Sequence, residues 1–189
     1  MKQKSSSASD NLVALHDWIE DACSKGAVPV ITGMNGDMDT VGSAISLAAS
    51  NQNMMACGLH LGRISKRVCQ ELGAPFRKIS NSLDLPSNIG GIIIVDAASE
   101  SQIGFQLPDG VPKCIIDHHE SVNWKFNKSD LAIRMNVSAT TEIIAKYLNE
   151  YSTSTLTEPV RKLLLAGLIT DSGRFKHNSK DSFITANEI

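Results

Sequence analysis

The chain has 189 residues, 42% of them hydrophobic and 20% charged, and its formal net charge at pH 7 is −2. This length and composition suit one globular domain whose core needs no disulfide framework. The lack of a basic excess argues against proteins that coat duplex DNA or membrane surfaces. No apolar run is long enough to span a bilayer, so we expect no membrane partner.

The N-terminal segment is polar and lacks the apolar stretch of a signal peptide. We therefore expect a flexible leader over residues 1–9, followed by one domain over 10–189. The four cysteines form neither a CxxC pair nor a zinc-finger spacing. This pattern favours reduced thiols in a cytoplasmic protein.

Apolar runs that resemble strands alternate with segments of helical periodicity along the domain. We expect helices over 11–22, 41–50, 64–73, 140–151 and 158–171, and the start of another over 182–189. We expect strands over 27–32, 54–61, 89–98, 113–117 and 130–136. The alternation predicts an α/β fold with a mainly parallel sheet flanked by helices on both faces. The apolar run "GIIIV" is typical of a strand buried on both sides.

Acidic residues and histidines follow four of the apolar segments. They are Asp37 and Asp39 after the first strand, Asp96 after "IIIV", Asp117, His118 and His119 after "CII", and Asp171 after "LLLAGLIT". Taken singly, each aspartate is an ordinary turn or helix-cap residue, and the two histidines belong to a polar turn. In open α/β sheets, however, ligands bind at the carboxyl ends of the strands, so these side chains are expected to converge.

Several carboxylates in one small space need a compensating positive charge, and a divalent cation supplies it. Carboxylates with one or two imidazoles suit Mn²⁺ or Mg²⁺ better than a structural zinc ion, which prefers thiolates. The spacing Asp37-x-Asp39 allows one loop to serve two ions. Paired ions are a common device for cleaving phosphate esters, so the pattern predicts a two-metal phosphoesterase.

Five segments in chain order resemble motifs of the DHH phosphoesterases: "NGDMDTVGSAISLA", "IIIVDAA", "IIDHHES", "SATTEIIAKYL" and "GLITDSGRF". This family includes RecJ-type exonucleases, nanoRNases that also dephosphorylate nucleoside bisphosphates, cyclic-dinucleotide phosphodiesterases and family II inorganic pyrophosphatases. The resemblance covers most of the chain. It implies a hydrolase that acts on short oligonucleotides, nucleoside bisphosphates or dinucleotides, with two Mn²⁺ ions as cofactors and Mg²⁺ as the alternative.

The resemblance also implies roles for individual residues. The metal ligands would be Asp37, Asp39, Asp96, His118 and Asp171, with Asp96 as the bridge between the ions. Asp117 and His119 would be catalytic residues, with His119 facing the substrate phosphate. Arg174, Lys176 and His177 follow the fourth motif and are the remaining basic candidates for contact with that phosphate, with Arg174 also a candidate catalytic residue; a solvated turn is the alternative for all three. The implied partner is a short nucleic acid or nucleotide, and a homodimer is a common state of the family.

Two departures from the family pattern bear on function. The family's first motif usually opens with a histidine four residues before its first aspartate, and here that position is Gly33. The family also usually carries a glycine-rich, basic C-terminal domain, so we expect this chain to end before a substrate-binding domain. A degenerate, non-catalytic nucleotide-binding or regulatory module and a manganese-dependent pyrophosphatase therefore stay open as alternatives.

Overall fold

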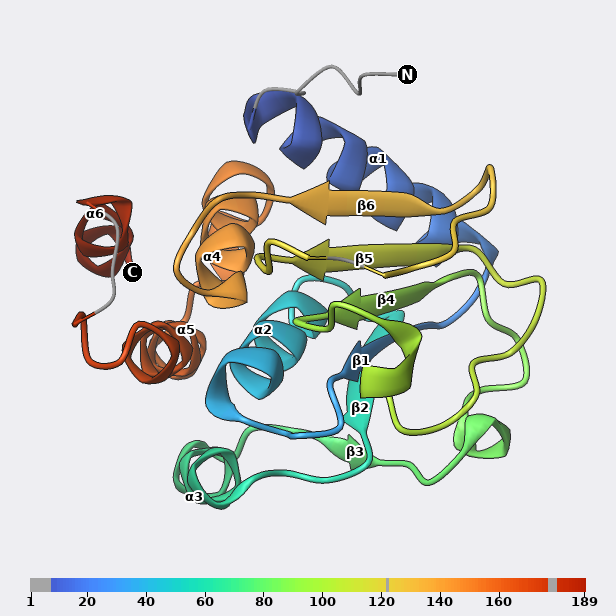
Figure 1. Ribbon diagram of the computed structural model, residues 1–189, viewed down its shortest axis with the longest axis horizontal. Coiled ribbons are helices and arrows are strands. Elements are labelled where there is room, and N and C mark those ends of the chain that lie inside the picture. The colour runs from blue at the N-terminus through green and yellow to red at the C-terminus, as the bar shows by residue number, and fades with distance from the viewer. Residues whose placement is uncertain (1–7, 122, 177–179) are drawn as a thin grey trace.

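The computed structural model describes residues 8–121, 123–176 and 180–189. Its core is one six-stranded sheet in the order β3-β2-β1-β4-β5-β6, in which every neighbouring pair is parallel (Figure 1). The strands are β1 (Val28–Thr32), β2 (Met54–Gly58), β3 (Arg77–Lys78), β4 (Ile92–Val95), β5 (Lys113–Asp117) and β6 (Leu131–Arg134). The predicted parallel α/β fold is confirmed.

The α-helices lie close to the predicted ranges. They are α1 (Ala8–Lys25), α2 (Met38–Ala48), α3 (Arg63–Leu72), α4 (Thr140–Tyr151), α5 (Glu158–Asp171) and α6 (Lys180–Glu188). Helices α4 and α5 have the predicted bounds, whereas α2 begins three residues earlier than expected. None of the described helices is both long enough and apolar enough to cross a membrane. The predicted leader falls on residues 1–7, outside the described residues, and on Ala8 and Ser9, which instead open α1.

The two faces of the sheet are covered by helical segments of different kinds. The buried apolar residues of α1 to α5 all pack on one face, against strand residues such as Val30, Val95 and Ile116. The opposite face, which includes Ile31, Ile94 and Ile115, is covered by loops. These loops contain the short 3-10 helices η1 (Ser82–Asp84) and η2 (Glu100–Gln102).

The connections run in opposite directions from the middle of the sheet. From β1 the chain passes through α2 to β2 on one side, whereas from β4 it passes to β5 and β6 on the other. Strand order therefore reverses between β1 and β4, which are hydrogen-bonded neighbours. In doubly wound sheets, the crevice at such a reversal is where ligands bind, outside the carboxyl ends of the strands. The arrowheads of β4, β5 and β6 point toward the side where α4 and α5 lie (Figure 1).

Candidate metal centre

The loop after β1 is held in place by one threonine. The Gly33 amide donates to Thr40 Oγ1 (2.9 Å), and the same hydroxyl donates to the Val95 carbonyl at the end of β4 (3.1 Å). Asp37 caps α2, because its Oδ1 accepts the Thr40 amide (3.1 Å) and its Oδ2 accepts the Asn35 side-chain amide (2.5 Å). The hydrogen bonds of Thr40 thus fix the first acidic loop against the end of β4.

Asp39 lies in the first turn of α2 and is buried against the N-terminus of α4. Its Oδ2 accepts the Thr140 amide (2.7 Å), and its Oδ1 accepts the amide (2.9 Å) and hydroxyl (2.7 Å) of Thr141. A helix N-terminus favours a negative charge in this way because its first amides lack partners within the helix. Gly167 of α5 permits the close packing, since a Cβ there would lie 2.5 Å from Thr141 Cγ2 and 3.2 Å from the Cα of Asp39.

Asp96 directly follows β4 and points into the same space. Its amide still donates to the Ile116 carbonyl (2.9 Å), but its φ of 56° turns the chain sharply out of the sheet. Aspartate tolerates this left-handed conformation better than most residues, although at some cost. The side chain is only 8% exposed, and its Oδ1 accepts the Thr140 hydroxyl (3.2 Å). Thr140 therefore contacts Asp39 through its amide and Asp96 through its hydroxyl.

His118 joins the acidic residues into one cluster. Its Nε2 lies 3.5 Å from Asp96 Oδ1 and 3.4 Å from Asp171 Oδ2 at the end of α5. Ligand atoms of Asp39, His118 and Asp171 lie within 4.8 Å of one another, and so do those of Asp96, His118 and His119. The structure thus brings together four of the five predicted metal ligands in two overlapping groups that share His118.

Asp117 orients the second histidine of the triplet. Its Oδ1 lies 2.6 Å from His119 Nδ1, and because an ionised carboxylate only accepts, that nitrogen carries the proton. Asp117 is fully buried, and within the described part of the chain its Oδ2 has no hydrogen-bond partner. His119 is 42% exposed and lines a hollow of about 170 Å³ together with Asp37, Asp96 and Asp171.

The crowding of these groups changes their acidity. Burial, reinforced by the charges of Asp96 and Asp171, raises the pKa of Asp39 well above its ordinary value. Burial also raises the pKa values of Asp37 and Asp171. Burial by itself lowers the pKa of His118, but its hydrogen bond to Asp96 and the charges of the surrounding carboxylates outweigh burial and raise that pKa to about 9. Ionisation of these clustered carboxyl groups is therefore unfavourable, and a bound cation would favour it.

The raised pKa of His118 predicts that metal binding depends on pH. A cation needs a neutral imidazole nitrogen, so each ion that binds His118 displaces a proton at pH values below about 9. We expect Mn²⁺ affinity to rise with pH between about 6.5 and 9, and binding at pH 7.5 to release about one proton per ion at His118. Calorimetric titration in two buffers of different ionisation enthalpy measures this release. His118→Asn should abolish it, whereas His60→Asn, at an exposed histidine, should not. Equal heats in both buffers for the unaltered protein would contradict the expectation.

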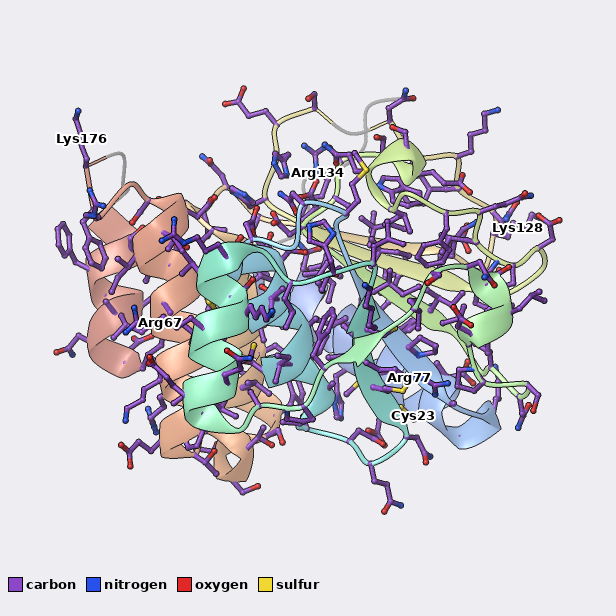
Figure 2. The ribbon with its side chains drawn as sticks, turned by 90° about the horizontal axis from the view of Figure 1, so that it is seen from below. Cys23, Arg67, Arg77, Lys128, Arg134 and Lys176 are labelled. Carbon is purple, nitrogen blue, oxygen red and sulfur yellow. The ribbon has the colours of Figure 1, made fainter. Side chains whose placement is uncertain are left out.

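The remaining predicted residues, where the structure describes them, belong to neither group of ligand atoms. Asp37 nevertheless lines the hollow that contains His119. Arg174 and Lys176 follow α5 with exposed side chains, and the structure describes neither of them in the lining of the hollow. Figure 2 shows Lys176 projecting outward at a corner of the molecule. His177 lies outside the described residues. Contacts of these three with phosphate stay predictions.

Several residues of the site were not predicted from the sequence. Gln102 lines the hollow, Thr140 and Thr141 hold the aspartates, and Arg134 donates to the carbonyls of the DHH loop. The two threonines lie about a hundred residues from Asp39 along the chain. Their sequence signal was the segment "SATTEIIAKYL", which resembles a family motif at a helix start but does not identify Asp39 or Asp96 as their partners.

The donor set fits a divalent cation of the Mn²⁺ or Mg²⁺ type. It consists of carboxylates and imidazoles, it contains no thiolate, and its carboxylates are buried close enough to raise one another's pKa. The four cysteines are free thiols, and all of them lie buried in the core. Asn35 Oδ1 lies 3.2 Å from the position that a Cβ on Gly33 would take, so an amide oxygen lies beside the space that a side chain at residue 33 would enter.

Comparison with known proteins agrees with this geometry. The family model "DHH family, N-terminal domain" matches residues 27–168. A putative family II inorganic pyrophosphatase from Methanococcus jannaschii is similar in structure, with a TM-score of 0.71, 23% identity, and coverage of 85% of this chain and 54% of that one. An exopolyphosphatase-related protein from Bacteroides fragilis has a TM-score of 0.65 and 15% identity, and the match covers 98% of this chain and 57% of that one.

These structural matches concern the fold, because their identities are low, and this chain spans just over half the length of either protein. No curated protein sequence gives a significant match. The family model, in contrast, extends from the residue before β1 to Leu168 near the end of α5, and so includes most of the candidate metal centre. The chain therefore belongs to the DHH family, whose N-terminal domain it contains.

Proposed function

We propose that this chain is the metal-binding part of a hydrolase that cleaves phosphate esters of short oligonucleotides, nucleoside bisphosphates or dinucleotides. One observation carries the proposal: Asp39, Asp96, His118 and Asp171, from four different elements, place ligand atoms within 4.8 Å in two groups that share His118. Membership of the DHH family supports the same class of reaction. Mn²⁺ is the proposed cofactor and Mg²⁺ the alternative.

The metal ligands, His119 and the two threonines would have different roles in this reaction. Two divalent cations bound by the carboxylates and His118 would neutralise charge on the attacking and leaving oxygens of a phosphate ester. Asp117 holds the His119 ring through Nδ1. Nε2 is then the nitrogen left for the substrate, and it would donate to a phosphate oxygen when the imidazole carries both protons. Thr140 and Thr141 fix the carboxylates, so little reorganisation is needed when negative charge develops.

The substrate class is tested with chelator-stripped protein to which Mn²⁺ is returned. The panel contains a dinucleotide, a nucleoside 3′,5′-bisphosphate and pyrophosphate, because the fold is shared with a putative pyrophosphatase. We expect Mn²⁺-dependent release of mononucleotide or phosphate from the first two substrates. Turnover of pyrophosphate alone would favour the pyrophosphatase alternative. Metal binding without turnover of any substrate would favour a non-catalytic module.

Gly33 supplies no side-chain ligand, so we expect one metal ion to bind weakly. Replacing Gly33 by histidine tests this expectation. The backbone of Gly33 is not in the left-handed region, and a Cβ there would meet Asn35 Oδ1 at 3.2 Å and the Asp96 carbonyl at 3.3 Å. A side chain therefore fits if Asn35 and the Asp96 carbonyl each shift by a few tenths of an ångström. We expect Gly33→His to tighten Mn²⁺ binding by about tenfold or more, the scale on which ligand surroundings tune metal affinity. Calorimetric titration measures the change.

The matched control for this gain is Gly33→Ala, which adds the same Cβ without a ligand and should not tighten binding. Turnover measured in parallel separates two functions. If the unaltered protein is inactive and Gly33→His is active, the chain as it stands is a degenerate module. If both are active, residue 33 only tunes metal affinity.

A further inference from the structure

A second hollow adjoins the DHH triplet. It has a volume of about 330 Å³ and is lined by His118, His119, Glu120, Arg134, Met135 and Asn136. His119 lines both this hollow and the one that contains Asp37, Asp96 and Asp171. A phosphate that lies against His119 beside the metal ligands therefore has a neighbouring space for the rest of its molecule.

Arg134 is the cation of this second hollow. It ends β6 in register with Asp117 of β5, and its Nη2 donates to the carbonyls of His119 (2.5 Å) and Glu120 (2.6 Å). Within the described residues, its Nε and Nη1 make no hydrogen bond, and Glu120 forms no ion pair with it. Figure 2 shows Arg134 well separated from Lys176, which lies at the corner of the molecule.

The geometry of Arg134 suits an anion. Two carbonyls fix one edge of a planar guanidinium, so the remaining donors are already oriented before a ligand arrives. Such a fork matches the oxygens of a phosphate, and charge-assisted hydrogen bonds of this kind are the strong ones. Glu120 is the single acidic residue in the lining described here, against one guanidinium and two imidazoles.

We propose that Arg134 binds a second phosphate of the substrate while the reacting phosphate lies against His119. The inference rests on the proposed function, which it deepens: the preferred substrates are nucleotides with a second phosphate on the same ribose or on the next residue. Simple phosphomonoesters leave the second hollow without an anion. Arg134 is then a specificity-determining residue, in addition to holding the DHH loop.

The test compares two substrates in Arg134→Gln, which removes the charge but keeps an amide that can donate to the loop carbonyls. We expect KM for a nucleoside 3′,5′-bisphosphate to rise about tenfold or more, the usual loss for a hydrogen bond to a charged group. We expect KM for p-nitrophenyl phosphate, which has no second phosphate, to rise much less, because a loss that acts through the DHH loop is shared by both substrates. Arg134→Lys keeps the charge and should show a smaller, equally selective rise. The control Arg77→Gln, on the opposite edge strand β3, should change neither substrate.

Equal loss of kcat for both substrates, with KM unchanged, would overturn the proposal, because Arg134 would then act only through the DHH loop. If Arg134→Gln does not fold, the same comparison is made with Arg134→Lys, and a loss without selectivity would overturn it. If the unaltered protein turns over neither substrate, the proposed function fails. The inference is then decided by calorimetric binding of the bisphosphate and of a nucleoside monophosphate in Mn²⁺. Weaker binding of the bisphosphate alone in Arg134→Gln supports it, and no difference overturns it.

Discussion

Asp96→Asn is expected to reduce Mn²⁺-dependent hydrolysis by on the order of 10²–10³-fold or more, the range seen when one preorganised electrostatic group is removed. Asp96 lies at the strand reversal, 3.5 Å from His118 Nε2, and is expected to bridge the two ions. The variant exchanges a charged ligand for a neutral one of the same shape. Steady-state turnover of the nucleoside bisphosphate measures the effect.

The choice of asparagine makes this substitution specific for charge. Residue 96 has a φ of 56°, and asparagine is among the residues that tolerate this conformation best. The fold should therefore survive, and the metal-free variant should be no less stable than the unaltered protein, because one member of a crowded carboxylate group is gone. Asp109→Asn, at an exposed acidic residue in the β4–β5 connection, is the matched control and should leave turnover unchanged. Full activity of Asp96→Asn would show that the charge of Asp96 is not needed for hydrolysis and would contradict its role as a bridging ligand.

Mn²⁺ is expected to stabilise the fold strongly. At a free concentration of roughly 1,000 times its Kd, an ion that binds only the folded state adds about 4 kcal/mol to the free energy of unfolding. For a chain of this length, that corresponds to a rise in Tm of roughly 8–16 °C. Burial, reinforced by neighbouring carboxylates, raises the pKa values of Asp39 and Asp171, and a bound cation would offset both effects. Thermal unfolding with and without chelator measures the rise.

Asp39→Asn separates this effect from simple packing. Asp39 accepts three hydrogen bonds from Thr140 and Thr141 with its two carboxylate oxygens. Asparagine offers one oxygen and turns an NH₂ group toward a donor, which costs about 1–3 kcal/mol in addition to the lost ligand. We expect a lower Tm and a much smaller response to Mn²⁺. A Tm that responds to Mn²⁺ equally in Asp39→Asn and in the unaltered protein would place the stabilising ion elsewhere.

The fold was predictable from the sequence where a segment is long and strongly patterned. Helices α4 and α5 have the predicted bounds because their apolar residues repeat with helical spacing over three turns or more. Strand β3 was missed because its two residues, Arg77 and Lys78, are exposed and basic, and carry none of the usual strand signal. The sequence also did not predict that loops and 3-10 helices cover the second face of the sheet. That covering depends on which face of the sheet each connecting segment crosses.

The candidate site shows the same division. Residues at the ends of apolar runs could be named in advance, because parallel strands bring their carboxyl ends to one edge of the sheet. The residues that orient them could not. Thr141 reaches Asp39 across 102 positions of sequence, and Gly167 matters only because α5 packs against both. These partners follow from tertiary packing, which no local pattern encodes.

Anomalous X-ray scattering from crystals grown with Mn²⁺ is the most direct test of whether this cluster binds metal, because it locates the ion without relying on activity. We expect anomalous density among Asp39, Asp96, His118 and Asp171. We also expect Asp96→Asn crystals to lose at least part of that density. Anomalous density confined to exposed acidic residues, with none near His118, would contradict the assignment of this cluster as the metal centre.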